Sequence, residues 1–527
     1  MTPFQVSLMI KTQGELLDVF IIGGGISGAA IAAECAGRGL SVTLCDRNDV
    51  GGASSSQSDQ ILPGAIQFLR SHNLPYFNKV IKEKARLRQR APHLCRERPF
   101  VVVPAPNRQP SPISRIWLWL FQNWLQGGNT AGLAKRHPDR VQAAPLRPQG
   151  GLPWVMEESM VDDARLVIEN LLFAEQHQGS IWPHHQFISA HRHQGQWQIT
   201  LCNREQQEVQ VASRCLINAA GIRVNEVQRR IADSDSRCWI ESKRKLFMLI
   251  PKFYQGDHAY QIETAGSPVS VTPYLEHFCL VSRVTGIGTD EASADPSLQE
   301  QTDLIHTLNQ YFQVQLAADA VIRCYCIQQP LYCDDREGSP EGVEDYALDL
   351  SCVDGRSPLI SIFGGSFATH RAMAEEAVEM LGHYLPSEPT ATTRCPLPGG
   401  DLHPQGFDQF ILHVASEFPW LPSRLLNHYC RTYGARTLTL LEGCHALDDL
   451  GPPICPGLHQ REAEFLMQNE WVNSAEDILW RRTRLGLYAS TDEVTRLQRW
   501  VEAHLPSPSR KQGYTMWSKP VPPGRLH

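Results

Sequence analysis

Asp18-Val-Phe-Ile-Ile-Gly-Gly-Gly-Ile-Ser-Gly28 is the stretch that decides the fold of this 527-residue chain. Its apolar part, residues 19–22, predicts a buried parallel strand. Gly23, Gly25 and Gly28 then fill the frame G-x-G-x-x-G. The first glycine of this frame permits a tight turn, the second lets backbone N–H groups approach a pyrophosphate at a helix N-terminus, and the third lets the helix pack on the strand. The stretch therefore predicts a bound dinucleotide.

The residues that follow complete a strand-turn-helix-strand unit. Small residues dominate the stretch 29–39, which predicts a thin helix, and residues 40–45 predict a second strand that leads into Asp46. The spacing from Gly28 to Asp46 is 46 − 28 = 18 residues, close to the roughly 20 at which an acidic side chain reaches the ribose hydroxyls. A tight turn that binds no ligand is the alternative, and the agreement of all these parts argues against it. The pattern leaves NAD and FAD both open.

Length and composition favour a large enzyme with no nucleic-acid partner. A chain of 527 residues predicts about two to four domains. Its 49 basic and 56 acidic residues give a net charge of −7, so nothing indicates a surface for nucleic acid. The 15 cysteines form no C-x-x-C pair and no cluster at zinc spacing, which indicates reduced thiols and no metal site. Residues 1–17 lack the apolar core of a signal peptide, so we expect a cytoplasmic protein.

A tryptophan-rich segment, residues 113–125, has two interpretations. It holds three tryptophans and is followed by Lys135, Arg136 and Arg140, a combination that suits a helix lying in a membrane interface. A packed core helix is the alternative, since apolar segments of about 10–14 residues are usually buried. The sequence does not decide between the two.

Two further strand ends are expected near a flavin, if the cofactor is one. Residues 215–221 form an apolar strand that stops at Gly221, and residues 359–365 form another. The second strand feeds Gly364 and Gly365 into a following helix. This helix N-terminus can meet a polar, electron-rich ring edge.

Several other segments carry a family resemblance. They include Ser54-Ser-Ser56 and Asn218-Ala-Ala-Gly221 near the N-terminal unit, and Tyr433-Gly-Ala-Arg-Thr437 and Asn469-Glu-Trp471 near the C-terminus. On these segments the chain resembles the FAD-dependent glycerol-3-phosphate dehydrogenase family, as a divergent member with an altered substrate site. Further similar segments are residues 161–166, 330–335, 363–365, 369–376 and 477–486. The resemblance thus spans nearly the whole chain.

The resemblance implies FAD rather than NAD, and it implies an α/β fold. The expected parts are a Rossmann-like FAD-binding domain of the glutathione-reductase/D-amino-acid-oxidase type, a mixed α+β substrate domain and a C-terminal helical domain. Their expected bounds are 18–75, 155–222 and 355–385 for the FAD-binding domain, 76–154 and 223–354 for the substrate domain, 390–505 for the helical domain, and 506–527 for a disordered tail.

The resemblance also implies a cofactor site and partners. It puts the pyrophosphate over Gly25, Gly28 and the three serines, with the flavin ring between Gly221 and Gly365. The expected FAD-binding residues are Gly23, Gly25, Gly28, Asp46, Ser54, Ser55, Ser56, Ala220, Gly221, Gly364, Gly365 and Phe367. The expected partners are a small-molecule substrate, a quinone electron acceptor at the inner face of the membrane, and a second copy of the chain in a homodimer.

The substrate half departs from the family where the family carries basic groups. The replacements are Gln60, Pro63, Gln67, Gln329, Glu344 and Ser366. Four of these replacements, Gln67, Gln329, Glu344 and Ser366, would each remove a charge-assisted bond of about 1.5–3 kcal/mol. If the losses were additive, the binding of a phosphate ester would be weakened by about 6–12 kcal/mol. Pro63 stands where the family has His and cannot accept a proton. The catalytic residues are therefore not identified.

The remaining charges leave alternatives open. Cations stand where the family has other residues, at Arg223, Lys243, Arg244, Lys245 and Arg283. They could rebuild an anion site, or residues 242–245 could be a solvated basic run; Asp59 and Glu344 could instead indicate a cationic or neutral polar substrate. Three functions follow, in this order: an FAD-dependent oxidoreductase of changed substrate, a quinone-linked glycerol-3-phosphate dehydrogenase with a rebuilt anion site, and a non-catalytic flavoprotein.

Overall fold

The computed structural model describes most of the chain. The described residues are 16–62, 64, 74–105, 137–148, 151–234, 236, 238–288, 295–334, 345–353, 355–402 and 406–505. Outside these ranges lie Pro63, Gln67, Glu344, the tryptophan-rich segment 113–125 and the tail 506–527. The chain divides into two compact units, Met1–Asp401 and Leu402–His527.

The first unit contains two large sheets, and one of them carries the glycine-rich turn. Its strand β1 (Leu17–Ile22) pairs in parallel with β2 (Val42–Cys45) and β8 (Glu208–Asn218). The other strands are β5 (Ser180–Trp182), β6 (Gln186–His193), β7 (Gln196–Cys202), β14 (Tyr346–Val353) and β15 (Arg356–Gly364), in the order β14-β15-β8-β1-β2-β5 with β7 on β8 and β6 on β7. The apolar run 19–22 is buried throughout, as in parallel sheets covered on both faces.

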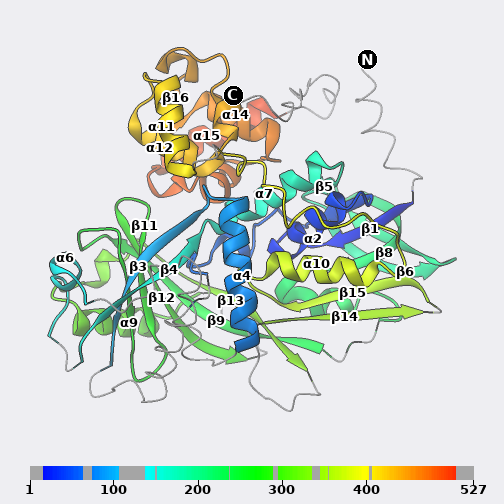
Figure 1. The fold of residues 1–527 in the computed structure, drawn as a ribbon, viewed down its shortest axis with the longest axis horizontal. Coiled ribbons are helices and arrows are strands. Elements are labelled where there is room, and N and C mark those ends of the chain that lie inside the picture. Colours follow the sequence, from blue (N-terminus) through cyan, green and yellow to red (C-terminus); the bar gives the residue numbers. More distant parts are fainter. Residues whose placement is uncertain are drawn as a thin grey trace. The chain divides into compact units, whose positions relative to one another are not determined.

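Helix α2 (Ile26–Gly37) lies close to this sheet because its residues are small. A Cβ added to Gly28 would lie 1.9 Å from the Gly23 carbonyl oxygen, so a larger residue would force the helix away from the turn. Helices α7 (Asp163–Gln176) and α10 (His370–Leu381) pack on α2, and Figure 1 shows α2 and α10 beside the strands. The predicted strand-turn-helix-strand unit is confirmed.

The second sheet has one face covered by a helix. Its strand order is β13-β9-β12-β11-β10-β3-β4, with the bounds β3 (Cys95–Val103), β4 (Trp154–Val161), β9 (Cys238–Pro251), β10 (Ala259–Ile262), β11 (Val269–Tyr274), β12 (Phe278–Gly288) and β13 (Arg323–Asp334). Leu304 and Leu308 of α9 (Leu298–Tyr311) join a buried cluster with Leu246, Met248 and Ile250 of β9. Because side chains alternate along a strand, the odd-numbered residues of β9 face away from α9.

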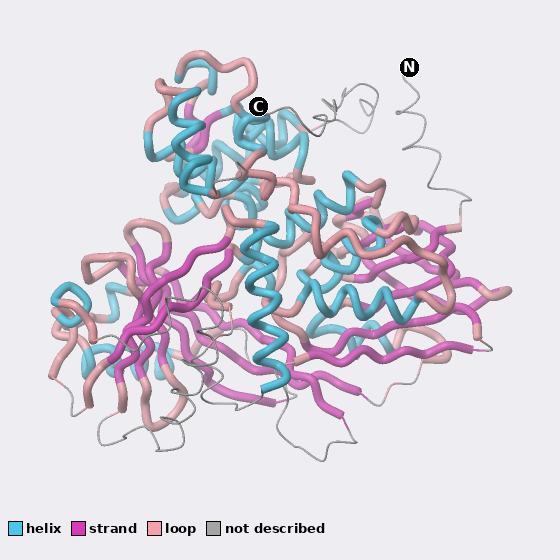
Figure 2. The backbone as a smooth tube through the Cα atoms, viewed as in Figure 1, coloured by secondary structure: helices cyan, strands magenta, loops and turns pink. Residues whose placement is uncertain are grey.

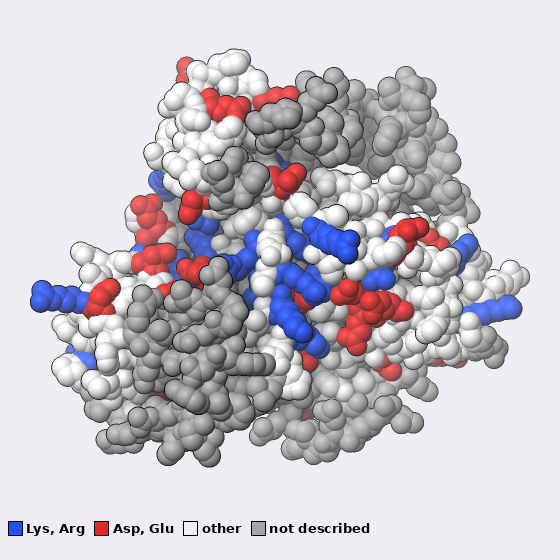
Figure 3. Space-filling model, in the orientation of Figure 1, with Lys and Arg blue, Asp and Glu red and all other residues white. Residues whose placement is uncertain are grey.

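A long helix, α4 (Leu74–Arg90), is tied to α10 by a buried ion pair. Arg371 Nε and Nη2 donate to the two carboxylate oxygens of Glu83 at 2.6 and 2.8 Å. Lys and Arg side chains gather over α4 on the face shown in Figure 3. The shorter elements of this unit are η1 (Ser54–Ser56), α6 (Arg140–Ala143), η2 (Gly221–Arg223), α8 (Val224–Gln228) and η3 (Ala318–Ala320).

The second unit is mostly helical, as predicted for the C-terminal part (Figure 2). Its elements are α11 (Phe407–Glu417), α12 (Ser423–Tyr433), α13 (Arg436–Leu440), η4 (Leu447–Leu450), β16 (Pro453–Cys455), β17 (Leu458–His459), α14 (Gln460–Asn469), η5 (Asp477–Arg482), η6 (Leu485–Leu487) and α15 (Thr491–His504). Its own core includes Tyr429, Tyr433 and Leu466, all fully buried. The predicted α/β fold with a second mixed sheet and a helical C-terminal domain is confirmed.

A membrane-crossing helix is not found within the described ranges, since none there combines the necessary length with the necessary apolar character.

Candidate functional site

A cavity of about 960 Å³ in the first unit collects most of the predicted site residues. It is lined by the glycine-rich turn, η1, the segments that follow β2, β8 and β15, and the face of the second sheet that points away from α9. Ligands of open α/β sheets bind at this place, outside the carboxyl ends of the parallel strands. The volume lies at the upper end of the range of about 300–1,000 Å³ for small-molecule sites, which suits a large ligand.

The glycine-rich turn opens the N-terminus of α2 toward the cavity. Gly23 has φ +110°, and a Cβ there would lie 2.5 Å from the Ala219 carbonyl oxygen. Gly25 precedes α2 and provides no side-chain cap, while the backbone N–H of Ile26 donates to Ser55 Oγ at 3.2 Å. A helix N-terminus of this kind attracts the negative charge of a phosphate.

Asp46 occupies the position expected for an acid that binds a ribose. Its carboxylate accepts backbone N–H bonds from Gly24 and Asn48, both at 2.8 Å, and it lines the cavity. Burial raises the pKa of Asp46 above its ordinary value, although these two hydrogen bonds act in the opposite direction. The side chain is thus held rigidly beside the turn with its oxygens available to a ligand.

The remaining predicted cofactor residues surround the same cavity. Gly364 and Gly365 have φ of +78° and +101°, and a Cβ on Gly364 would lie 2.5 Å from the Asp345 carbonyl oxygen. The predicted residues that line the cavity are Gly23, Gly25, Asp46, Ser54, Ser55, Ala220, Gly221, Gly364, Gly365 and Phe367. Gly28 serves the packing of α2 instead, and Ser56 Oγ donates to the Ala53 carbonyl oxygen at 3.3 Å. The open helix terminus, the acid and the close backbone turns together fit a dinucleotide cofactor.

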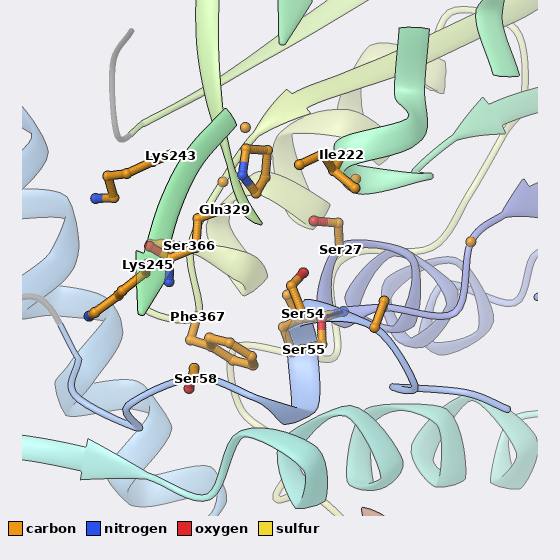
Figure 4. Close-up of a pocket in the computed structure, with 18 of the residues that line it drawn as sticks. Ser27, Ser54, Ser55, Ser58, Ile222, Lys243, Lys245, Gln329, Ser366 and Phe367 are labelled. Atoms are coloured by element: carbon orange, nitrogen blue, oxygen red, sulfur yellow. Dashed lines mark hydrogen bonds between the residues drawn. The ribbon is translucent and has the colours of Figure 1, made fainter. Parts of the chain in front are cut away.

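The basic run 242–245 is not a solvated run, because β9 divides it between two faces. Arg244 points toward α9 and forms an ion pair with Glu300. Lys243 and Lys245 line the cavity on the opposite face, and they extend in the same direction from their strand in Figure 4. Lys245 is only 14% exposed and forms an ion pair with Asp59. Two cationic side chains of β9 therefore line the cavity.

Of the positions where the resemblance implies a basic group in the family, three are described, and all three line the cavity: Gln60, Gln329 and Ser366. Gln329 lies opposite Lys243 in the pairing of β13 with β9. Ser366 Oγ is within hydrogen-bonding distance of Tyr76 Oη at 3.3 Å and of Thr369 Oγ1 at 3.2 Å. The cavity keeps polar groups at these positions without positive charge.

Arg223 and Arg283, two further predicted candidates, also line the cavity. Arg223 is 45% exposed and lies 3.6 Å from a carboxylate oxygen of Glu226, which also binds Arg230 at 2.8 Å. Exposed pairs of this kind contribute little to binding or stability. Arg283 stands on β12 beside Ser282.

Three polar residues of the second sheet were missed by the sequence analysis. Gln261, Ser270 and Ser282 come from adjacent strands β10, β11 and β12 and line the cavity. Ser270 Oγ donates to Gln261 Oε1 at 2.8 Å. For Gln261 and Ser270 the signal in the sequence is a single polar residue between apolar neighbours, which marks a face but not what that face meets; Ser282 is followed by Arg283 and lacks this signal.

A second missed contact anchors the loop after η1. Asp163, the first residue of α7, accepts hydrogen bonds from Ser58 Oγ at 2.7 Å and from the Ser58 backbone N–H at 2.9 Å. This loop then presents Asp59 to Lys245 and Gln60 to the cavity. The acidic start of α7 therefore positions cavity residues. Within the described ranges, no group of three or more His, Cys, Asp or Glu side chains could hold a metal ion.

Comparison with known proteins gives the family. Residues 18–349 match the family model of FAD dependent oxidoreductases, and residues 390–504 match that of the C-terminal domain of alpha-glycerophosphate oxidase. The chain is 32% identical over 500 residues to a glycerol-3-phosphate dehydrogenase of Pseudomonas aeruginosa, covering 93% of this chain and 96% of that protein. It is 31% identical over 501 residues to a D-erythritol 1-phosphate dehydrogenase of Brucella abortus, covering 93% and 98%.

Solved structures agree with this in fold. The glycerol-3-phosphate dehydrogenase from Bacillus halodurans complexed with FAD superposes with a TM-score of 0.71 at 20% identity, over 95% of this chain and 96% of that one. The chain therefore belongs to the FAD-dependent glycerol-3-phosphate dehydrogenase family, and FAD is its cofactor.

Proposed function

We propose that the protein is an FAD-dependent dehydrogenase that oxidises a small polar substrate other than glycerol 3-phosphate. The observation that carries this proposal is the composition of the cavity. Gln60, Gln329 and Ser366, at three positions where the resemblance implies a basic group, line the cavity, and its sheet face carries Lys243 and Lys245. When bound, FAD supplies the acceptor for a hydride that leaves the substrate carbon.

The residues of the chain would hold the cofactor from both ends. The N-terminus of α2 would bind the pyrophosphate through backbone N–H groups, and Asp46 would accept hydrogen bonds from the ribose hydroxyls. The turns at Gly221 and Gly364 would let the backbone approach the flavin ring without a side chain between them. The second sheet would then form the opposite wall of the substrate site.

The second candidate function is glycerol-3-phosphate dehydrogenase itself with a rebuilt anion site. Its support is the pair Lys243 and Lys245 on the cavity face of β9. The relatives do not discriminate, since two of similar identity are named for different polyol phosphates. A phosphate dianion is best held by forked arginines, and Asp59 beside Lys245 would repel it. These two points favour the changed substrate.

For re-oxidation we propose a quinone at the inner face of the membrane, with the protein bound peripherally from the cytoplasm, and we propose a homodimer. The support is the family resemblance and the gathering of Lys and Arg over α4 (Figure 3), because clustered basic residues attract anionic lipids. Sedimentation with vesicles of phosphatidylglycerol, compared with vesicles of phosphatidylcholine, tests the membrane part. Equal recovery in the supernatant of both would contradict it.

Anaerobic mixing with a panel of small alcohols, polyols, hydroxy acids and amines tests the proposed function. The purified protein is expected to carry oxidised FAD, and at least one compound of the panel other than glycerol 3-phosphate should bleach its absorption. A protein that binds no FAD, or a flavin that only glycerol 3-phosphate reduces, would overturn the proposal.

A further inference from the structure

The cavity face of the second sheet carries a row of polar groups that the proposed function leaves unassigned. From β10 to β9 the row consists of Gln261, Ser270, Ser282, Lys245 and Lys243. The register of the strands sets Gln261 opposite Ser270 and Ser270 opposite Ser282. Directly opposite residues of an antiparallel pair point to the same face, so the row is continuous across β10, β11 and β12. On β9, Ser282 lies opposite Phe247, and Lys245 and Lys243 lie further along that strand, opposite Val284 and Ile287.

Ser282 contributes to this row a hydroxyl without a protein partner among the described residues. Its side chain is 2% exposed, and its Oγ has no hydrogen-bond partner among the described residues. Buried hydroxyl groups in folded proteins are nearly always paired, and an unpaired one destabilises by about 1–3 kcal/mol. Because Ser282 lines the cavity, a polar group of a bound molecule is the natural partner.

Lys245 offers more donors than its contact with Asp59 uses. An ammonium group donates three hydrogen bonds, and Lys245 gives one to Asp59. That ion pair fixes the Lys245 head group, with Asp59 13% exposed, and leaves donors for a ligand. Lys243 lies two residues earlier on the same face and pairs across the strand with Gln329, which adds an amide donor. Several converging donors favour an oxyanion.

The charge around this donor set favours an anion with a single charge. Lys243, Lys245 and Asp59 together carry one net positive charge, which a monoanion neutralises, whereas a phosphate dianion would leave one negative charge uncompensated in the cavity. Lysine binds an oxyanion as a point charge and lacks the fork that matches phosphate. A carboxylate therefore suits the donor set better than a phosphate ester.

We propose, given the function proposed above, that the substrate is a small hydroxy carboxylic acid. Lys243 and Lys245 bind its carboxylate, and Ser282 with its neighbours Ser270 and Gln261 binds its hydroxyl groups. Oxidation of a hydroxyl breaks one C–H and one O–H bond, sends a hydride to FAD and a proton to water, and leaves an oxo acid.

Binding to the FAD-loaded protein tests this without turnover. Glycerate, glycerol and glycerol 3-phosphate share one carbon skeleton and differ in the carboxylate, the neutral alcohol and the phosphate ester. Each is titrated into the oxidised protein and followed by the shift of the flavin absorption and by calorimetry. Glycerate is expected to bind at least tenfold more tightly than either of the others.

Variants assign the binding to the lysines. Lys243→Met and Lys245→Met should each weaken glycerate binding about tenfold or more, and Lys245→Arg should restore part of it. Arg244→Met is the matched control, since it removes the same charge from the same strand on the face toward α9, and it should leave binding unchanged. FAD content and far-ultraviolet circular dichroism verify that each variant is folded.

Four results would each overturn this proposal. Glycerate and glycerol could bind equally, glycerate could fail to bind, glycerol 3-phosphate could bind more tightly than glycerate, or only Arg244→Met could lose the binding. If a neutral alcohol reduces the flavin and glycerate does not bind, the hydroxy-acid proposal is wrong and the proposed function stands. If glycerate binds through the lysines and no compound of the panel reduces the flavin, the carboxylate site stands and the proposed function is wrong.

Discussion

At the scale of single residues, the cofactor end of the cavity depends on where a side chain would collide with backbone. The Gly28 position is the most restrictive of the turn, with a Cβ placed 1.9 Å from the Gly23 carbonyl oxygen. Gly286 on β12 has nothing within 4 Å of the same added atom. The two glycines therefore make a matched pair.

Gly28→Ala should lower the free energy of unfolding by about 1–3 kcal/mol and reduce FAD content, because overpacking moves α2 away from the turn. Gly286→Ala should change neither quantity by much. Thermal unfolding and the ratio of flavin to protein absorption measure both. Full FAD content in Gly28→Ala would show that α2 does not need this close approach.

Asp46 should make FAD binding depend on pH. Burial raises the pKa of Asp46. In the protein without FAD, the protonated Asp46 carboxyl therefore contributes to folding stability below the ordinary pKa of aspartate. This contribution is lost as the pH rises through the raised pKa. FAD needs the ionised form as acceptor, so FAD affinity should fall as the pH falls through that raised pKa. Asp46→Asn should bind FAD about tenfold or more weakly and lose this pH dependence in fluorescence titrations. An unchanged pH profile in the variant would refute the role of Asp46.

At the scale of elements, the sequence was sufficient where the signal is local. The glycine turn, the small-residue helix and Asp46 lie within 29 consecutive positions, 46 − 18 + 1, and their arrangement followed from spacing. The sequence did not predict that Arg244 lies on one face of β9 and Lys243 and Lys245 on the other, because that division depends on α9 covering one face of the strand. The unpaired hydroxyl of Ser282 needed the neighbouring strands in register.

The packing of α4 against α10 should depend on the buried ion pair between Glu83 and Arg371. Burial alone would raise the pKa of Glu83, but the guanidinium groups of Arg371 and Arg86 together outweigh burial and hold the pKa below the ordinary value. The pair therefore stabilises the protein above the ordinary pKa of glutamate, and this stabilisation is lost as the pH falls through the lowered pKa.

Glu83→Gln should lower the free energy of unfolding by about 1.5–3 kcal/mol near neutral pH, since it weakens the charge-assisted bonds to a buried guanidinium that keeps Glu375 as a second partner. Glu379→Gln is the control, because Glu379 is 63% exposed and 3.9 Å from Arg38. Urea unfolding at pH 7 measures both. Similar stabilities of the two variants would argue against a buried pair.

At the scale of the whole molecule, the two units have separate cores, and the cavity is lined by residues of the first unit alone. FAD stabilises only what binds it. Calorimetry should therefore show two unfolding transitions, with only one raised in temperature by added FAD. Tyr433→Ala, a change in the core of the second unit, should lower the other transition. A single transition that added FAD and Tyr433→Ala both shift would mean that the two units unfold together.

The claim that the substrate site has changed is tested most directly by the rate at which glycerol 3-phosphate reduces the flavin. Anaerobic stopped-flow absorption would compare the natural protein with the double variant Gln329→Arg, Ser366→Lys, which returns two cationic groups to the cavity. We expect slow or no reduction in the natural protein and at least a tenfold increase in the variant. Rapid reduction of the natural protein by millimolar glycerol 3-phosphate, with no gain in the variant, would contradict the account.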